Sequence, residues 1–126
     1  MGKPRSKLIP YHKLKFPEVY GFTTEVHFGR QAKHMPGQPE YDPSRSPVTV
    51  DILTIQRLVL RHAGRGTLRG KNSNKETVNF GVTIGNYRSL NSTRSVPTTW
   101  VNIHYSKTGA HIVPAAPREE DHASKN

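Results

Sequence analysis

The side chains best suited to chemistry are gathered in one stretch of the sequence, residues 97–114. This stretch contains two histidines together with tyrosine, serine, threonine and lysine side chains. Cleavage of RNA without a metal ion needs a base for the 2′-hydroxyl proton, an acid for the leaving 5′-oxygen and donors that stabilise the charged phosphate. Histidine fills either proton-transfer role because its pKa is near neutral. The catalytic candidates of this stretch are Thr99, His104, Tyr105, Ser106 and His111.

The same stretch has the pattern of a strand hairpin. Apolar and polar residues alternate along its first half, which is typical of a half-buried strand. His104 and Ser106 are two residues apart, so on a strand they share one face at a spacing of roughly 6.6 Å. Tyr105 then points to the other face.

The turn of this hairpin decides where the second histidine lies. A two-residue turn at Lys107-Thr108 pairs Ser106 with Gly109 and His104 with His111, which places both imidazoles on one face. A three-residue turn with Gly109 in the left-handed region shifts the register by one residue, and His111 then faces away. The sequence leaves both registers open.

A second group of candidates lies in the proline-rich loop 29–47, which has a turn signal at Pro36-Gly37. Arg30, Lys33 and His34 there form a basic loop with one histidine. Such a loop can hold a phosphate and supply the second proton-transfer group, and long ordered loops in small domains are usually functional. The alternative is an ordinary solvated basic loop.

Basic residues elsewhere predict contacts with a nucleic-acid backbone. A loop rich in glycine, serine and asparagine at residues 65–75 contains four cations, and phosphate contacts by such residues would be salt-sensitive. An ordinary solvated loop is again the alternative. The predicted RNA-binding residues are Arg30, Arg65, Arg69, Lys71, Lys75 and Lys107.

Composition agrees with a polyanionic partner. The 126-residue chain has 19 Lys and Arg against nine acids, a formal net charge of +10. Such a surplus favours nucleic acid over an anionic membrane surface or an acidic protein, although it also promotes solubility. The absence of cysteine excludes disulfides and thiolate zinc sites, and the few acids argue against a two-metal nuclease. We expect no cofactor, no metal and no membrane segment.

The other secondary-structure elements are predicted from the periodicity of apolar residues and from the positions of glycine and proline. We expect a strand at 21–28, the long loop 29–47, one helix at 49–63, a strand at 77–87 and a loop at 89–96. A helix followed by strands indicates an α+β domain with an antiparallel sheet. We expect this domain to span residues 21–116, after an extended basic arm at 1–20 and before a disordered tail at 117–126.

Three blocks of these residues resemble, in the same order, the polymorphic-toxin type 50 domain. The blocks are Gly29–Gly37, Asn74–Gly81 followed by Ile84-Gly85, and Pro97–Pro114, of which the last is the most specific. The resemblance runs from about residue 26 to 116. The positions of this chain that match the motifs of the family are His34, His104, Tyr105, Ser106 and His111. It also leads us to expect a hydroxyl residue before the last histidine, where this chain has Ala110.

The resemblance implies a bacterial ribonuclease toxin domain. Such domains are parts of secreted or contact-delivered proteins, act in the cytoplasm of a target cell and are neutralised by a cognate immunity protein. The implied fold is that of barnase, the EndoU nucleases, the tRNA-cleaving colicins and the RelE toxins, in which an N-terminal helical element packs on a C-terminal antiparallel sheet.

We therefore expect a monomeric, metal-independent endoribonuclease toxin used in competition between bacteria. His104 with His34 or His111 would be the base and acid, and the groups expected to stabilise the phosphate are Lys33, Thr99 and Ser106. Cleavage of cellular RNA, with tRNA as one candidate, would leave 2′,3′-cyclic phosphate ends. An acidic immunity protein is expected because it would complement the basic surface. The alternatives are a non-catalytic nucleic-acid-binding module and a structural interaction domain.

Overall fold

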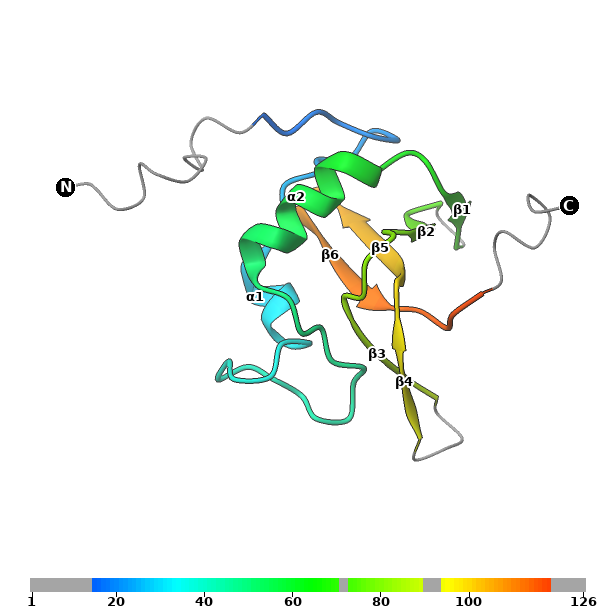
Figure 1. Ribbon diagram of the computed structural model, residues 1–126. Helices are drawn as coiled ribbons and strands as arrows, with labels where there is room; N and C mark the ends of the chain where they lie inside the picture. The colour runs from blue at the N-terminus through cyan, green and yellow to red at the C-terminus, as the bar shows by residue number, and fades with distance from the viewer. Residues whose placement is uncertain (1–14, 71–72, 90–93, 119–126) are drawn as a thin grey trace, which may run out of the picture.

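The computed structural model describes residues 15–70, 73–89 and 94–118, and within these ranges two helices precede six strands (Figure 1). The helices are α1 (Phe28–Ala32) and α2 (Ile52–His62). The strands are β1 (Thr67–Arg69), β2 (Lys75–Asn79), β3 (Gly85–Arg88), β4 (Ser95–Thr98), β5 (Trp100–Ser106) and β6 (Gly109–Pro114). The expected α+β class is confirmed.

The strands form two antiparallel sheets. The larger sheet has the order β1-β2-β5-β6, and the smaller one pairs β3 with β4. Helix α2 lies across one face of the larger sheet, and the β3–β4 hairpin extends from one end of the molecule (Figure 1). The expected antiparallel sheet is therefore confirmed.

Helix α2 forms where the apolar periodicity predicts it. The Asp51 side chain accepts a hydrogen bond from the Thr54 backbone N–H at 2.8 Å and so caps its first turn. Ile55 and Val59, one turn apart, are fully buried. Gly64 ends the segment with a φ of +92°, a conformation that glycine adopts without steric cost.

The β5–β6 hairpin has the two-residue turn. Ser106 pairs with Gly109, and His104 pairs with His111. Gly109 has a φ of +142°, and a Cβ atom there would lie 2.7 Å from the Cβ of His27. Only glycine fits this position without displacing the segment before α1. Of the two registers left open by the sequence, the structure has the one that places both histidines on one face.

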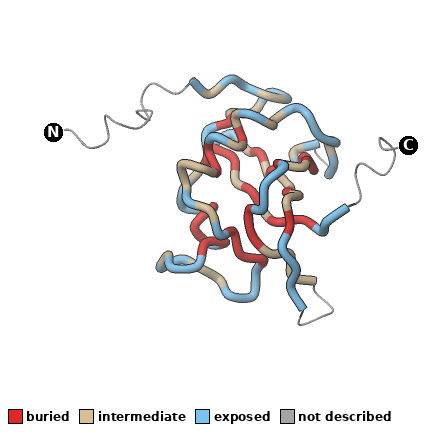
Figure 2. Tube along the Cα trace, in the orientation of Figure 1, coloured by how far each residue is buried: buried red, intermediate tan, exposed pale blue. Residues whose placement is uncertain are grey.

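Alternation along β5 separates a core face from an open face of the large sheet. Val101, Ile103 and Tyr105 are buried among the core residues, and buried segments run through the centre of the molecule beneath α2 (Figure 2). The intervening residues Asn102, His104 and Ser106 are only half-buried. We call the side to which they point the open face.

Helix α1 is held against β6 by a buried glutamine. The Gln31 side chain accepts a hydrogen bond from the Ile112 N–H at 2.7 Å and donates one to the Ile112 carbonyl at 3.0 Å. Its amide thus makes the pair of hydrogen bonds that a neighbouring strand would make. This contact places the residues that follow α1 beside β6.

The prediction of a strand at residues 21–28 is wrong. That segment makes only isolated bridges, Val19 with Phe22 and Val26 with Ala110, and helix α1 begins at Phe28 inside the predicted strand and loop. The reason is a cap: the His27 Nδ1 atom accepts a hydrogen bond from the Arg30 N–H at 3.2 Å.

Three further boundaries differ from the sequence prediction. The strand expected at 77–87 is divided into β2 and β3 by a turn in which Gly81 has a φ of +80°. Strand β1 lies inside the predicted basic loop 65–75, and β4 begins inside the predicted loop 89–96. Strands β1 and β4 pair with their neighbours in the chain, β2 and β3, and are too short for their alternation to stand out among the turn residues around them.

Some predicted features lie outside the described residues, namely residues 1–14 of the arm, Lys71 and residues 119–126 of the tail. Across the part of the chain that is described, no helix has the length and apolar character needed to cross a membrane.

Candidate catalytic site

The open face of the β5–β6 hairpin brings two imidazoles together. His104 and His111 are cross-strand partners, and their ring centroids are 4.9 Å apart with the planes tilted by 50°. Both side chains are half-buried. Two imidazoles at this spacing can contact one phosphate group from neighbouring positions.

A third imidazole lies beside this pair. His34 follows α1, and its ring stacks on that of His111 with 5.7 Å between centroids and 23° between planes. His34 is only 3 % exposed, and its Nδ1 atom is buried without a hydrogen-bond partner. The structure therefore joins the His34 loop to the hairpin, but places His34 behind His111 rather than in contact with solvent.

The pKa values of all three imidazoles are lowered. Burial, the nearby Lys75 and His34 lower the pKa of His104 to about 4. Burial, the other two histidines and the cations Arg30 and Arg45 lower that of His111 to about 3. Burial and Arg45 also lower the pKa of His34, although a hydrogen bond with the Ser46 backbone opposes this. The imidazoles are therefore neutral at pH 7, as a general base must be.

Ser106 positions an arginine at the edge of the pair. Its Oγ atom accepts a hydrogen bond from Arg30 Nη1 at 2.8 Å and donates one to the Gly109 carbonyl at 2.9 Å. The hydroxyl is thus tied to the turn and to a guanidinium. This geometry suits Ser106 to holding Arg30 near an anion.

The other predicted site residues lie at different distances from the histidines. Lys75 is the cross-strand partner of His104, whereas Lys33 and Lys107 are exposed at the end of α1 and in the hairpin turn. Thr99 precedes the first residue of β5, five positions from His104. An extended chain places it about 16 Å away, so the structure does not bring Thr99 to the imidazoles.

Tyr105 lies on the core side of the sheet, away from the histidines. It is 2 % exposed, and its hydroxyl donates a hydrogen bond to Glu76 Oε1 at 2.6 Å. Burial and the Glu76 carboxylate raise its pKa above the usual range. These contacts indicate a structural role, which corrects the sequence-based expectation that Tyr105 contributes directly to the chemistry.

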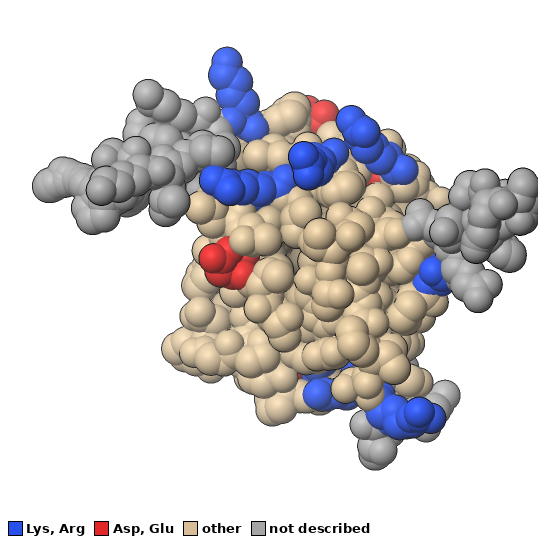
Figure 3. Space-filling view, in the orientation of Figure 1, with Lys and Arg blue, Asp and Glu red and all other residues tan. Residues whose placement is uncertain are grey.

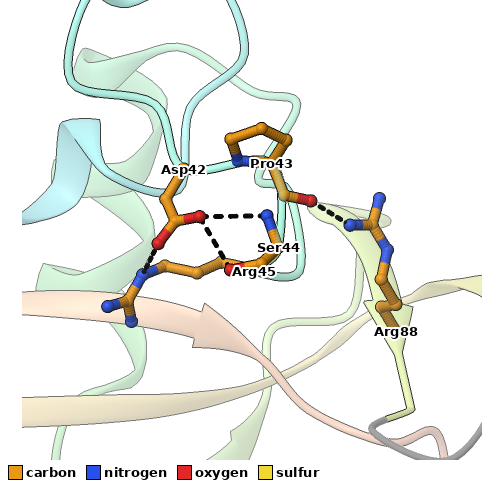
Figure 4. A network of polar contacts seen from close by, with 5 residues as sticks. All are labelled: Asp42, Pro43, Ser44, Arg45 and Arg88. Carbon is orange, nitrogen blue, oxygen red and sulfur yellow. Dashed lines mark hydrogen bonds and ion pairs between the residues drawn. The ribbon is translucent and has the colours of Figure 1, made fainter.

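Arg45, whose positive charge lowers the pKa of His34 and His111, is not among the residues predicted from the sequence. The loop that presents it is ordered by Asp42, which accepts hydrogen bonds from the Ser44 N–H at 3.0 Å, the Ser44 hydroxyl at 2.7 Å and Arg45 Nε at 3.0 Å (Figure 4). Arg88 of β3 donates to the Pro43 carbonyl in the same network. The Asp-Pro-Ser-Arg sequence, a common turn pattern, was the available signal.

The described cations of the basic loop at residues 65–75 lie at the β1–β2 edge. Arg65 is exposed in the α2–β1 turn, and Arg69 Nη1 donates a hydrogen bond to Thr77 Oγ1 at 3.2 Å. Figure 3 shows Lys and Arg side chains gathered over the end of α2 and the turn that follows it. This end of the molecule, around α2 and the turn that follows it, is therefore basic.

Lowering the pH from 7 to 5 is expected to destabilise the folded domain through His104 and His111. Their pKa values in the fold lie below the value of about 6.5 for an unfolded chain, so in this range the unfolded chain binds more protons. The stabilisation is complete above pH 6.5 and is lost as the pH falls, by at most about 1.4 kcal/mol per pH unit for each histidine. Partial exposure reduces this slope.

Urea denaturation at pH 7, 6 and 5 measures the effect. A variant with His104→Gln and His111→Asn together should have a clearly smaller pH dependence between 6.5 and 5, where carboxylates remain charged. The remaining dependence comes from His34 and His62, whose pKa values burial also lowers. An unchanged slope in that variant would contradict the assignment.

A family profile described as bacterial toxin 50 matches residues 26–114, which include every element from α1 to β6. The chain belongs to the bacterial toxin 50 family. Comparison with curated proteins gave no match. The family assignment makes this a bacterial toxin domain.

Two features of this toxin domain bear on the expectations from the sequence. Ala110 is fully buried on the core side opposite Tyr105, and its backbone pairs with Glu25 and His27. Replacing a hydroxyl residue by alanine at this position therefore changes the packing of the core and leaves the imidazole pair as it is.

Among the described residues, no three His, Asp or Glu side chains are arranged to hold a metal ion.

Proposed function

We propose that this toxin domain is a metal-independent endoribonuclease. The observation that carries the proposal is the pair His104 and His111, with ring centroids 4.9 Å apart on the open face of a basic domain. The cations Arg30 and Arg45 approach closely enough to lower the pKa of His111. Two proton-transfer groups beside fixed cations are what phosphodiester cleavage by an internal hydroxyl requires.

In the proposed reaction one imidazole takes the proton of the ribose 2′-hydroxyl. The 2′-oxygen forms a bond to phosphorus as the bond from phosphorus to the 5′-oxygen breaks. The other imidazole, in its protonated form, gives its proton to the leaving 5′-oxygen. The products are a 2′,3′-cyclic phosphate and a 5′-hydroxyl, and the two imidazoles have exchanged protonation states.

Substrate binding supplies the protonated imidazole. In the free protein both imidazoles are neutral at pH 7 because burial and neighbouring cations lower their pKa values. A phosphate anion placed between them and Arg30 raises the pKa of the nearest imidazole, since an opposite charge favours the charged form. His34 acts in this scheme as a positioning residue that holds the ring of His111.

The family supports a wider biological role. As a bacterial toxin domain, the protein is proposed to be delivered into the cytoplasm of a competing cell and to cleave RNA there. A cognate immunity protein with an acidic surface would complement the formal charge of +10.

Incubation of the purified domain with RNA in EDTA tests the proposal. We expect cleavage that is insensitive to EDTA, with products that carry 2′,3′-cyclic phosphate and 5′-hydroxyl ends. RNA with 2′-O-methyl groups should resist cleavage, because it has no nucleophile. Cleavage only with added metal, or binding without cleavage, would refute the proposal, and the latter result would favour a nucleic-acid-binding module.

A further inference from the structure

A second feature of the sheet lies at the other end of β5. A cavity of about 280 Å³ opens there, just below the range of roughly 300–1,000 Å³ found for small-ligand pockets. Its lining residues include Arg65, Thr67, Thr77, Asn79, Trp100 and Arg118. None of the described residues that line it is acidic, so the cavity favours an anionic or neutral ligand.

The architecture of the sheet explains why the cavity exists. Strand β1 is short, and its first residue Thr67 pairs with Thr77, so β1 leaves the Val78–Asn79 end of β2 uncovered. The α2–β1 turn closes the cavity from the side. Gly66 in that turn lies so close to β2 that an added Cβ atom would be 2.1 Å from the Thr77 carbonyl oxygen. The opening is thus bounded by backbone that cannot move inward.

The cavity has surfaces on which a planar base can stack. Arg118 lies over the ring of Trp100, with its guanidinium carbon 5.1 Å from the ring centroid. Aromatic rings and guanidinium planes are the two kinds of side chain on which unpaired RNA bases stack. A guanidinium at this place also provides a donor for a phosphate oxygen.

Trp100 and His104 lie on the same side of β5, four residues apart, which is about 13 Å. Between them on the open face lie Asn102 and Thr77, joined by a hydrogen bond of 2.6 Å from the Thr77 hydroxyl. Arg69 donates a hydrogen bond to the same threonine. The half-buried Asn102 and the exposed Arg69 therefore present polar and basic groups between the cavity and the imidazole pair, whereas Thr77 itself is buried.

We infer that the cavity beside Trp100 binds a base of the same RNA strand that is cleaved at the histidine pair, an inference that rests on the ribonuclease function proposed above. The separation of about 13 Å equals about four steps of a stacked strand with a rise of about 3.4 Å, or fewer steps of an extended one. The base in the cavity thus belongs to a nucleotide removed from the scissile bond. The ligand is single-stranded RNA of several nucleotides.

The fluorescence of Trp100, the only tryptophan of the chain, reports binding directly. Titration with an uncleavable 2′-O-methyl hexanucleotide should give saturable quenching at a salt concentration that is held constant. Arg118→Ala should weaken this binding several-fold, whereas Arg57→Ala removes an equal charge from the exposed side of α2 and should change it little. No quenching by RNA would overturn the inference, as would quenching by polyglutamate in place of RNA, which would identify a protein-binding cavity.

Cleavage of two substrates separates a binding role from a structural one. Trp100→Ala should lower kcat/KM for a hexanucleotide by about 10-fold or more, the usual effect of losing one stacked base, and leave cleavage of a dinucleotide unchanged. An equal loss on both substrates would overturn the inference, and Trp100→Phe should retain most of the activity on the hexanucleotide. If RNA quenches Trp100 but is not cleaved, the proposed ribonuclease function is refuted and the binding site is supported. If RNA is cleaved but does not quench Trp100, the ribonuclease function is supported and the binding site is refuted.

Discussion

His104→Ala or His111→Ala is expected to slow RNA cleavage by about 10²- to 10⁴-fold, the usual contribution of a general acid or base. Each substitution removes one of the two proton-transfer groups whose rings are 4.9 Å apart. The double variant should be little slower than either single variant, because residues that act as a unit have strongly non-additive effects. The rates are measured with an oligoribonucleotide in EDTA.

Controls distinguish lost chemistry from lost structure. Both single variants should keep the circular dichroism of the parent and a similar urea midpoint at pH 7, since the two side chains are half-buried on the open face. His34→Gln should slow cleavage less than either alanine variant, because His34 acts through His111. A folded His104→Ala or His111→Ala variant with the parental rate would remove that residue from the mechanism.

The largest effect on stability is expected at Glu76. This residue is fully buried, and its carboxylate accepts hydrogen bonds from the Tyr105 hydroxyl at 2.6 Å and from the backbone N–H groups of Gly64 and Gly66 at 3.0 and 2.6 Å. Glu76→Ala leaves these donors without a partner, at a cost of about 3–5 kcal/mol in the free energy of unfolding. A domain of this kind has only about 5–15 kcal/mol of stability in total.

Urea denaturation followed by circular dichroism measures this loss. Glu76→Gln keeps one acceptor oxygen and should be destabilised by an intermediate amount. Tyr105→Phe removes a single hydrogen bond to a charged group and should cost about 1.5–3 kcal/mol, while the folded variant cleaves RNA at the parental rate. A Glu76→Ala variant as stable as the parent, or a folded but inactive Tyr105→Phe variant, would contradict this account.

Local pattern predicted the elements whose stabilising contacts are local. Helix α2 has its cap, its apolar periodicity and its terminal glycine within residues 51–64. The alternation of β5 and β6 likewise predicted the hairpin, but the register of its turn was left open. The deciding contact is the approach of His27 to Gly109, which joins segments 82 positions apart and has no signature in the sequence.

The sequence likewise predicted only part of the candidate site, because residue types are visible in the sequence and contacts between distant segments are not. Residue chemistry pointed to His34, His104 and His111, which the fold brings together. It also included Thr99, although the predicted strand already separates this residue from His104 by five positions, or about 16 Å. The influence of Arg45 on the histidines was not predicted, because the loop that carries it is ordered by the hydrogen bonds of Asp42 and by Arg88 of β3.

The two hydrogen bonds between Gln31 and Ile112 join positions separated by 81 residues. Closing a loop of that length costs entropy that only the finished sheet can offset, so docking of α1 depends on β6 having already formed. His34 comes directly after α1 and reaches His111 only through that docking. We therefore expect a chain part-way through folding to acquire the His104–His111 pair before the ring that supports it, with the third imidazole joining the site in a late step of assembly.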